Sequence, residues 1–229
     1  MLFRFFCRIL GDDVELVDHD MRLFANAPGT ASLKVVSKTE PKGSVFVSVA
    51  VNGGERQQLF FGFVERATKA TADTWTLFCR EKIAALDRRL PISKRNVTLR
   101  EVLAEISSKT SISFALPKSG GYADKPVPHF VHMGTAIQAV RATAGVFNIP
   151  DFVCQQRRDG NIYVGSWKDG IWPDKPITMP ENLFDGVLSS ESMTTVLVPG
   201  LRPNYVLNGR RIYEVSIKGV SMGISWKKR

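Results

Sequence analysis

The chain has 229 residues, of which 44% are hydrophobic and 23% charged, with a formal net charge of +9. This balance predicts a folded chain of one or two domains with a sizeable core. No apolar run reaches eighteen residues, so we expect no membrane-spanning segment. The apolar stretch at residues 1–7 is too short for a signal peptide and Asp12 soon follows, so we expect synthesis in the cytoplasm.

Residues 1–80 have the pattern of β-strands. Val45, Val47 and Val49 recur with a period of two, and Asn52-Gly53-Gly54 then gives a turn signal. Further strands are expected around 59–64 and 74–77. Several strands joined by short turns predict a meander or a small barrel.

The middle region, residues 81–168, mixes helical and strand patterns. A short helix is expected over 81–90. Thr98 with Glu101, and Thr135 with Gln138, fit capping boxes that open two amphipathic helices. We also expect a strand at 112–116, a loop at 117–128 and a hairpin turning at 158–161. This region is predicted to be a small α+β insert.

Strand patterns return after a proline-rich stretch. Pro173, Pro176 and Pro180 mark residues 169–182 as a linker. Over 183–229, Asn208-Gly209 is a tight hairpin signal, and alternating apolar residues follow it. The predicted fold class is therefore α+β, mainly β, with two β regions around an α+β insert.

Histidine and cysteine offer few candidates for chemistry. His129 and His132 would share a face for a metal only in a helix, which Pro126 and Pro128 oppose. Cys154 with His132 is a conceivable nucleophile pair, but their spacing does not favour it. We expect buried free thiols because the cysteines are odd in number and widely spaced: Cys7, Cys79 and Cys154.

Acidic and basic residues also give no site. The acidic residues around His19 lack the glycine and terminal glutamate of a calcium loop, so we interpret them as a solvated turn: Asp12, Asp13, Asp18 and Asp20. Lysine and arginine are scattered, which leaves a basic nucleic-acid-binding protein as an alternative. We expect no catalytic, metal-binding or cofactor-binding residue, and no enzyme.

The order of these segments resembles the phage tail hub, or baseplate hub, family (late control protein D-like). The resemblance runs over most of the chain. It is carried by Phe24–Gly29, Leu59–Val64, Val97–Ile106, Ile112–Phe114, the helix at 135–147, Asp159–Gly165, Val198–Gly200, Val206–Ile212 and Met222–Trp226.

This resemblance implies two tube-like β-barrels. Residues 1–80 would form the N-terminal barrel and 183–229 would complete the second, with the insert 81–168 and the linker 169–182 between them. Three copies would then form a homotrimeric, pseudo-sixfold ring that joins the tail tube to the tip or spike. The chain is shorter than usual members, so we expect peripheral domains to be missing.

The implied location is the virion, at the tail tip or baseplate. The implied partners are further copies of the chain, a tail tube or distal tail protein, and a tip, spike or fibre protein. A tape-measure protein or DNA in the channel is a further candidate partner. A distal tail or peripheral baseplate protein with related barrels is the alternative within this class.

Overall fold

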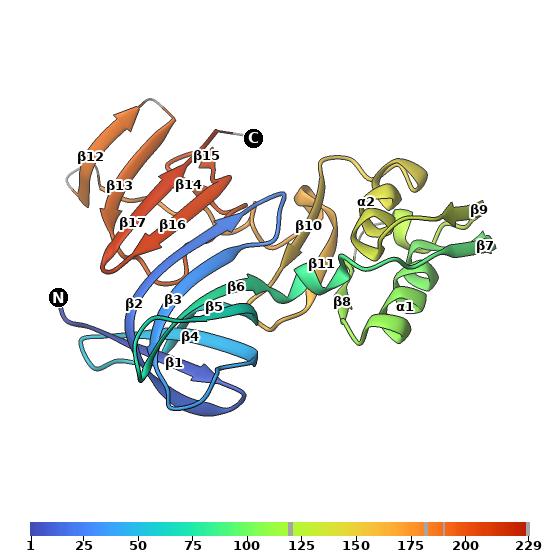
Figure 1. Cartoon of the computed structure of the whole chain (residues 1–229). Coiled ribbons are helices and arrows are strands. Elements are labelled where there is room, and N and C mark those ends of the chain that lie inside the picture. Colours follow the sequence, from blue (N-terminus) through green and yellow to red (C-terminus); the bar gives the residue numbers. More distant parts are fainter. Residues whose placement is uncertain (119–120, 181–182, 190, 228–229) are drawn as a thin grey trace. The chain divides into compact units, whose positions relative to one another are not determined.

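The computed structural model describes residues 1–118, 121–180, 183–189 and 191–227 (Figure 1). The chain forms two compact units. One unit comprises Met1–Lys82 and Pro176–Arg229, and the other Ile83–Lys175. Strands dominate, and both α-helices belong to the second unit, so the mainly β fold is confirmed. The expected division at 80/81 and 168/169 stays a prediction.

The first unit is built on a ten-stranded sheet with the order β1-β4-β5-β6-β3-β2-β16-β17-β13-β12. Two further short strands of this unit, β14 and β15, form a separate antiparallel pair. The strands of this unit are β1 (Phe3–Ile9), β2 (Asp12–Phe24), β3 (Thr30–Val36), β4 (Gly43–Val51), β5 (Gln57–Lys69), β6 (Thr74–Glu81), β12 (Phe184–Ser189), β13 (Ser192–Val196), β14 (Val206–Leu207), β15 (Arg210–Arg211), β16 (Glu214–Lys218) and β17 (Ser221–Ser225).

Strands β1 to β6 pair in a closed ring. Strand β1 pairs with β4 along its whole length and also with β2, where Cys7 lies opposite Val14 and Ile9 opposite Asp12. The later part of β2 leaves β1 and pairs with β16, with Met21 opposite Ile217. The C-terminal strands therefore extend the sheet of the first six. The two-barrel architecture is not confirmed, because sheet pairing joins both β regions.

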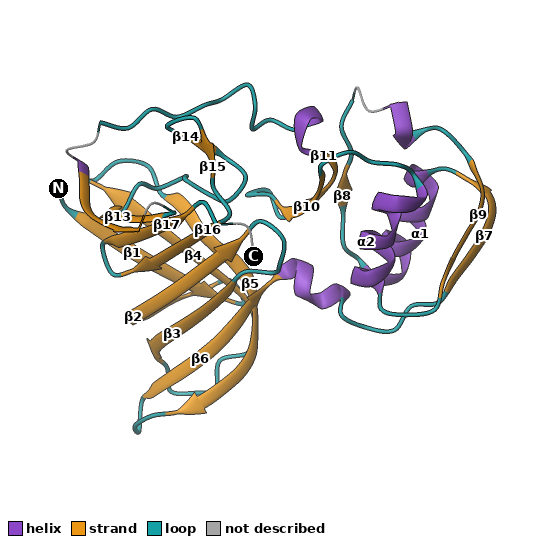
Figure 2. Ribbon diagram, turned by 90° about the horizontal axis from the view of Figure 1, so that it is seen from above, coloured by secondary structure: helices purple, strands orange, loops and turns teal. Residues whose placement is uncertain are grey.

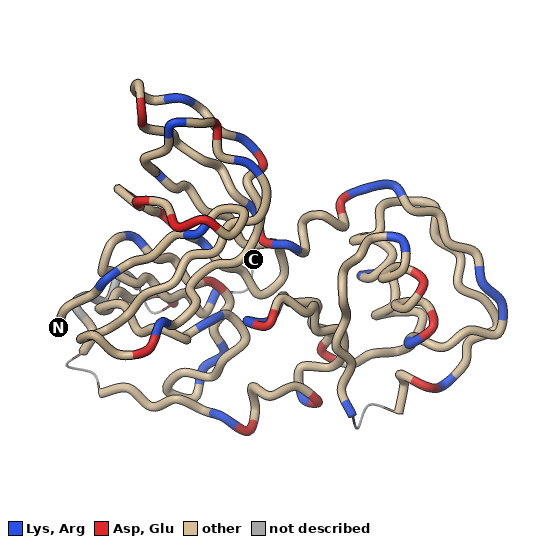
Figure 3. Tube along the Cα trace, turned by 90° about the horizontal axis from the view of Figure 1, so that it is seen from below, with Lys and Arg blue, Asp and Glu red and all other residues tan. Residues whose placement is uncertain are grey.

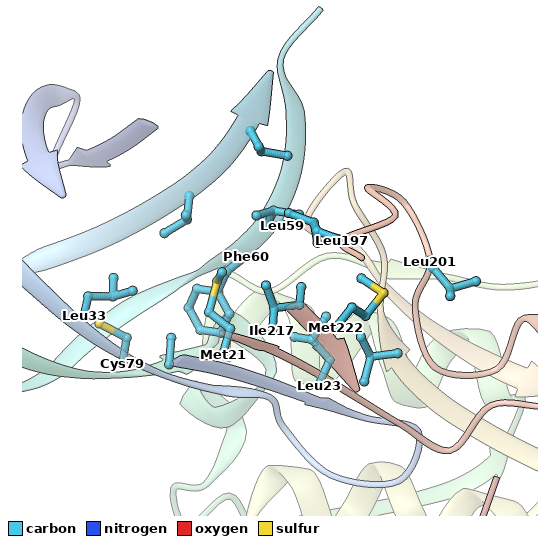
Figure 4. Packing of buried hydrophobic residues seen from close by; sticks show 14 of the residues in the cluster. Met21, Leu23, Leu33, Leu59, Phe60, Cys79, Leu197, Leu201, Ile217 and Met222 are labelled. Atoms are coloured by element: carbon cyan, nitrogen blue, oxygen red, sulfur yellow. The ribbon is translucent and has the colours of Figure 1, made fainter. Parts of the chain in front are cut away.

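Alternation along the strands separates an inner from an outer face. The inner positions form one core that draws on both β regions, as the close view in Figure 4 shows. Phe60 and Met222 are fully buried there, and Ile217 is 1% exposed. Burial of apolar area on this scale is the main force holding the two sequence segments in one unit.

The described part of the second unit contains two α-helices, five short strands and 3-10 turns (Figure 2). Strands β7 and β9 form an antiparallel ribbon, and β10-β11-β8 a small sheet. The elements are β7 (Ile92–Val97), α1 (Leu99–Thr110), β8 (Phe114–Ala115), η2 (Gly121–Ala123), β9 (Val127–His132), α2 (Ala136–Val146), β10 (Phe152–Gln156), β11 (Ile162–Ser166) and η3 (Trp167–Asp169).

The capping boxes in the sequence correctly predicted where α1 and α2 begin. The hydroxyl of Thr98 accepts from the backbone N–H of Glu101, whose carboxylate accepts from the N–H of Thr98 at 2.8 Å. Thr135 and Gln138 form the same reciprocal pair at the start of α2. Both predicted capping boxes are confirmed. The predicted hairpin between β10 and β11 is also present.

Other local predictions were wrong. The helix expected over 81–90 is only a 3-10 turn, η1 (Lys82–Leu86). Beyond it the backbone bonds elsewhere, since Leu90 donates to Gly134 and Ala136 donates to Arg88. The strand expected at 112–116 is reduced to β8, and the loop expected at 117–128 contains η2 and the start of β9.

The described part of the predicted linker at 169–182 is held in place by hydrogen bonds and by packing. Ile177 forms a bridge with Leu207, and the side chain of Asn208 bonds both the N–H and the carbonyl of Met179. Trp172 is buried and meets the ring of Tyr163 edge-on. Residues 181–182 of the expected linker lie outside the described residues.

Candidate assembly surface

A buried ion pair joins the two sequence segments of the first unit. One Nη of Arg202 donates to Glu81 at 2.7 Å, and the other donates to the carbonyl of Leu59 at 3.3 Å. The second oxygen of Glu81 accepts from the N–H of Gly29 at 2.8 Å. The side chains of Arg202 and Glu81 are only 7% and 4% exposed. This cluster ties the loop before β14 to strands β5 and β6.

Glycine is required at one corner of this cluster. A Cβ on Gly29 would lie 2.9 Å from the Glu81 carboxyl and 2.8 Å from Leu23. The motif Phe24–Gly29 and the turn at 199–204 thus converge on Glu81, although they are distant in sequence. Burial raises the pKa of Glu81, while Arg202 and the Gly29 N–H act in the opposite direction.

The outer face of β1 and β4 carries arginine and phenylalanine. Arg4 and Arg56 are exposed, and their guanidinium carbons lie 5.2 Å and 3.7 Å from the centre of the Phe6 ring. Phe46, on the same face of β4, is 36% exposed, and its ring lies 6.0 Å from that of Phe61. These four residues, Arg4, Phe6, Phe46 and Arg56, are called the arginine face below.

The outer face of β2 is acidic. Outward positions carry Asp13, Glu15, Asp18 and Asp20. Asp13 pairs with Arg8 at 3.3 Å, and Asp20 lies 3.7 Å from Arg22. The solvated turn expected here was wrong, because the hydrogen bonds of β2 to β1 and β3 hold this segment in a strand.

His19 lies within the acidic strand but turns to its inner side. It is 6% exposed, and burial lowers its pKa although Asp18 and Asp20 are close. A ring nitrogen lies 3.3 Å from the carbonyl of Gly219. This histidine packs in the unit and does not extend the acidic surface.

The predicted histidine and cysteine candidates do not form a site. His129 is exposed on one face of β9, whereas Phe130 and His132 lie on the other, as expected for an extended segment. Among the described residues no group of three or more metal-ligating side chains occurs. Burial raises the pKa of the Cys154 thiol to about 12, the opposite of what an activated nucleophile needs.

Cys7 and Cys79 are free and buried, as predicted, whereas Cys154 is free but only partly buried. An open pocket of about 330 Å³ lies where β2 ends beside β16. Its charged lining consists of Glu214 and Lys227, and Lys227 lies 3.9 Å from Glu191. Within the described part of the chain, no helix is long and apolar enough to cross a membrane.

Neither the Glu81–Arg202 ion pair nor the two charged outer faces was predicted from the sequence. Glu81 stands between Arg80 and Lys82, which gives no sign of burial, whereas Arg202 stands between the apolar residues Leu201 and Pro203. The apolar context of Arg202 signals burial, but not the partner. Figure 3 shows why charge alone is uninformative, since acidic and basic positions are interspersed along the chain.

No family model matches the chain. A 58.7 kDa protein from the lys 3′ region of Haemophilus phage HP1 is 32% identical over 213 residues, which are 93% of this chain and 40% of that protein. The chain thus spans about 40% of the length of this curated relative.

Solved tail proteins have a similar fold. The 43 kDa tail protein of prophage MuSo2 from Shewanella oneidensis aligns with a TM-score of 0.68 and 11% identity, covering 98% of this chain and 96% of that one. A tail protein from Neisseria meningitidis MC58 aligns with a TM-score of 0.65 and 10% identity, covering 99% of this chain and 96% of that one. An E. coli component of the type VI secretion system aligns with a TM-score of 0.63 and 11% identity, covering 97% of this chain and 76% of that one. That protein is described as structurally similar to the T4 tail proteins gp27 and gp5. The chain therefore shares the fold of these proteins.

Proposed function

We propose that the chain is a structural hub protein of a phage or phage-derived tail. Three copies form a pseudo-sixfold ring that joins the tail tube to the tip or spike. The observation that carries this proposal is the fold shared with tail proteins over nearly the whole chain. The phage relative supports the same setting.

Open sheet edges favour assembly with further copies. Strand β1 pairs with β2 only from Cys7 to Ile9, while Phe3–Phe6 pairs with β4 alone. At the other end of the sheet, β12 pairs with β13 alone among the described strands. Backbone groups on such edges are available to a neighbouring chain, and closing a ring would cover them.

The internal packing of the first unit also suits a ring that must resist mechanical force. The Arg202–Glu81 pair and the shared core hold strands from both β regions in one unit. In this proposal the work is done by interfaces, and the protein is not an enzyme. The partners are the tail tube or distal tail protein, the tip, spike or fibre protein, and material passing through the channel.

Electron microscopy of assembled tails tests the proposal. A threefold ring at the distal end of the tube is the expected result, with light scattering of the purified chain as a companion measurement. A different position would point to the distal tail or peripheral baseplate alternative. Absence of the chain from tails, together with salt-dependent DNA binding, would overturn the hub proposal in favour of a nucleic-acid-binding protein.

A further inference from the structure

We propose that the arginine face of one copy docks onto the acidic outer face of β2 in a second copy. The inference deepens the proposed function, since it assigns the surfaces through which copies meet. The acidic contact is made by Glu15 and Asp18, with Val17 between them. In a threefold ring this contact would run head-to-tail, with the arginine face of each copy on β2 of the next.

Among the described residues, the arginines of this face have no carboxylate partner. Arg4 and Arg56 contact the ring of Phe6, and neither makes an ion pair with a described residue. This differs from Arg8 on the same strand, which pairs with Asp13. Arginine over an aromatic ring presents its outer edge for hydrogen bonds to a carboxylate.

The two carboxylates of the acidic contact also lack ion-pair partners among the described residues. Among described residues, neither Glu15 nor Asp18 makes an ion pair, although Lys34 stands opposite Asp18 in the register of β3. Val17 is the extra residue of the register shift between Leu16 and Asp18 and is 52% exposed. An exposed apolar residue thus lies between two exposed carboxylates.

The two surfaces match in composition. Each combines an apolar side chain with charges: Arg4 and Arg56 lie over the ring of the half-buried Phe6, and Glu15 and Asp18 flank Val17, which is 52% exposed. Apolar centres with charged rims are typical of protein interfaces, and the charges fix orientation and speed of association. Within the described part of one chain no ion pair joins the two surfaces, and the β1–β2 pairing ends at Cys7 and Val14.

Charge reversal with restoration tests this inference on the full chain. Self-association of the wild type is measured by sedimentation velocity at ionic strengths of roughly 0.05 M and 0.5 M, because salt screens exposed charges. The variant Arg4→Glu/Arg56→Glu should weaken self-association by at least about tenfold at low salt. Glu15→Lys/Asp18→Lys should weaken it similarly. The variant with all four changes should recover it.

A matched control changes the charge by the same amount elsewhere. Arg66→Glu/Lys125→Glu replaces two exposed basic residues and should leave self-association unchanged. Circular dichroism and thermal unfolding check that each variant is folded, and the four-residue variant serves the same purpose, since recovery requires a native structure.

Three results would overturn the inference. They are a strictly monomeric wild type at low salt, self-association that ignores both reversals, and failure of the four-residue variant to recover. A monomer that binds duplex DNA through Arg4 and Arg56 would assign the arginine face to nucleic acid instead. None of these results decides the hub proposal, because that depends on where the chain lies in assembled tails.

Discussion

Arg202→Met should destabilise the first unit strongly. The substitution keeps most of the side-chain volume but leaves Glu81 buried without its cation, with only the Gly29 N–H to satisfy it. Removing one member of a buried ion pair typically costs about 3–5 kcal/mol of unfolding free energy. The side chains are 7% and 4% exposed and 2.7 Å apart, so solvent screens this pair little and the full range applies.

The loss should depend on pH in a defined direction. Burial already raises the pKa of Glu81, and removing Arg202 takes away the largest influence that lowers it. A carboxyl whose pKa is raised on folding favours the folded state below its unfolded value of 4.5, and this contribution is lost as pH rises through the folded pKa. The destabilisation by Arg202→Met should therefore be greatest at neutral pH and shrink as the pH falls.

Urea unfolding of the wild type and variants between pH 5 and pH 8 measures this effect. The double variant Glu81→Gln/Arg202→Met is the matched control, because it removes both charges and should recover most of the loss. A loss below about 1 kcal/mol at neutral pH, or a loss of equal size at every pH, would refute the reasoning.

Three further outcomes follow from single residues. Thr98→Ala removes the cap of α1 and should cost about 1 kcal/mol of unfolding free energy in urea titrations; no loss would contradict the capping geometry. Phe60→Ala opens a cavity in the first core and should cost about 3–5 kcal/mol, seen as a lowered Tm. Burial raises the pKa of the Cys7 and Cys79 thiols to about 12, so a thiol reagent at pH 8 should modify them only in urea, while Ser93→Cys on exposed β7 should react in the native protein. Rapid modification of the native cysteines would contradict the buried positions.

Features set by neighbouring residues could be predicted from the sequence. The Thr98–Glu101 capping box needs residues three apart, and both partners were identified. The hairpin at Asn208-Gly209 needs positive φ at both positions, and the structure has 47° and 75° there. Such features depend little on the rest of the fold, so local pattern is sufficient.

Features set by distant partners could not be predicted in this way. Arg202 and Glu81 are 121 positions apart, and nothing in their local context names the other. The pairing of β16 with β2 is similar, because many strands have an apolar face that fits the same core. That pairing decides whether the C-terminal strands close on themselves or extend the first sheet. Local sequence patterns do not specify it, so the expectation of two barrels depended on the family resemblance alone.

The most direct test of the hub assignment is the symmetry and position of the chain in an assembled tail, seen by cryo-electron microscopy. We expect three copies in one ring at the distal end of the tube, with β1 to β6 of each copy in the ring wall. A tail in which the chain is absent from this ring, or sits elsewhere with another symmetry, would contradict it.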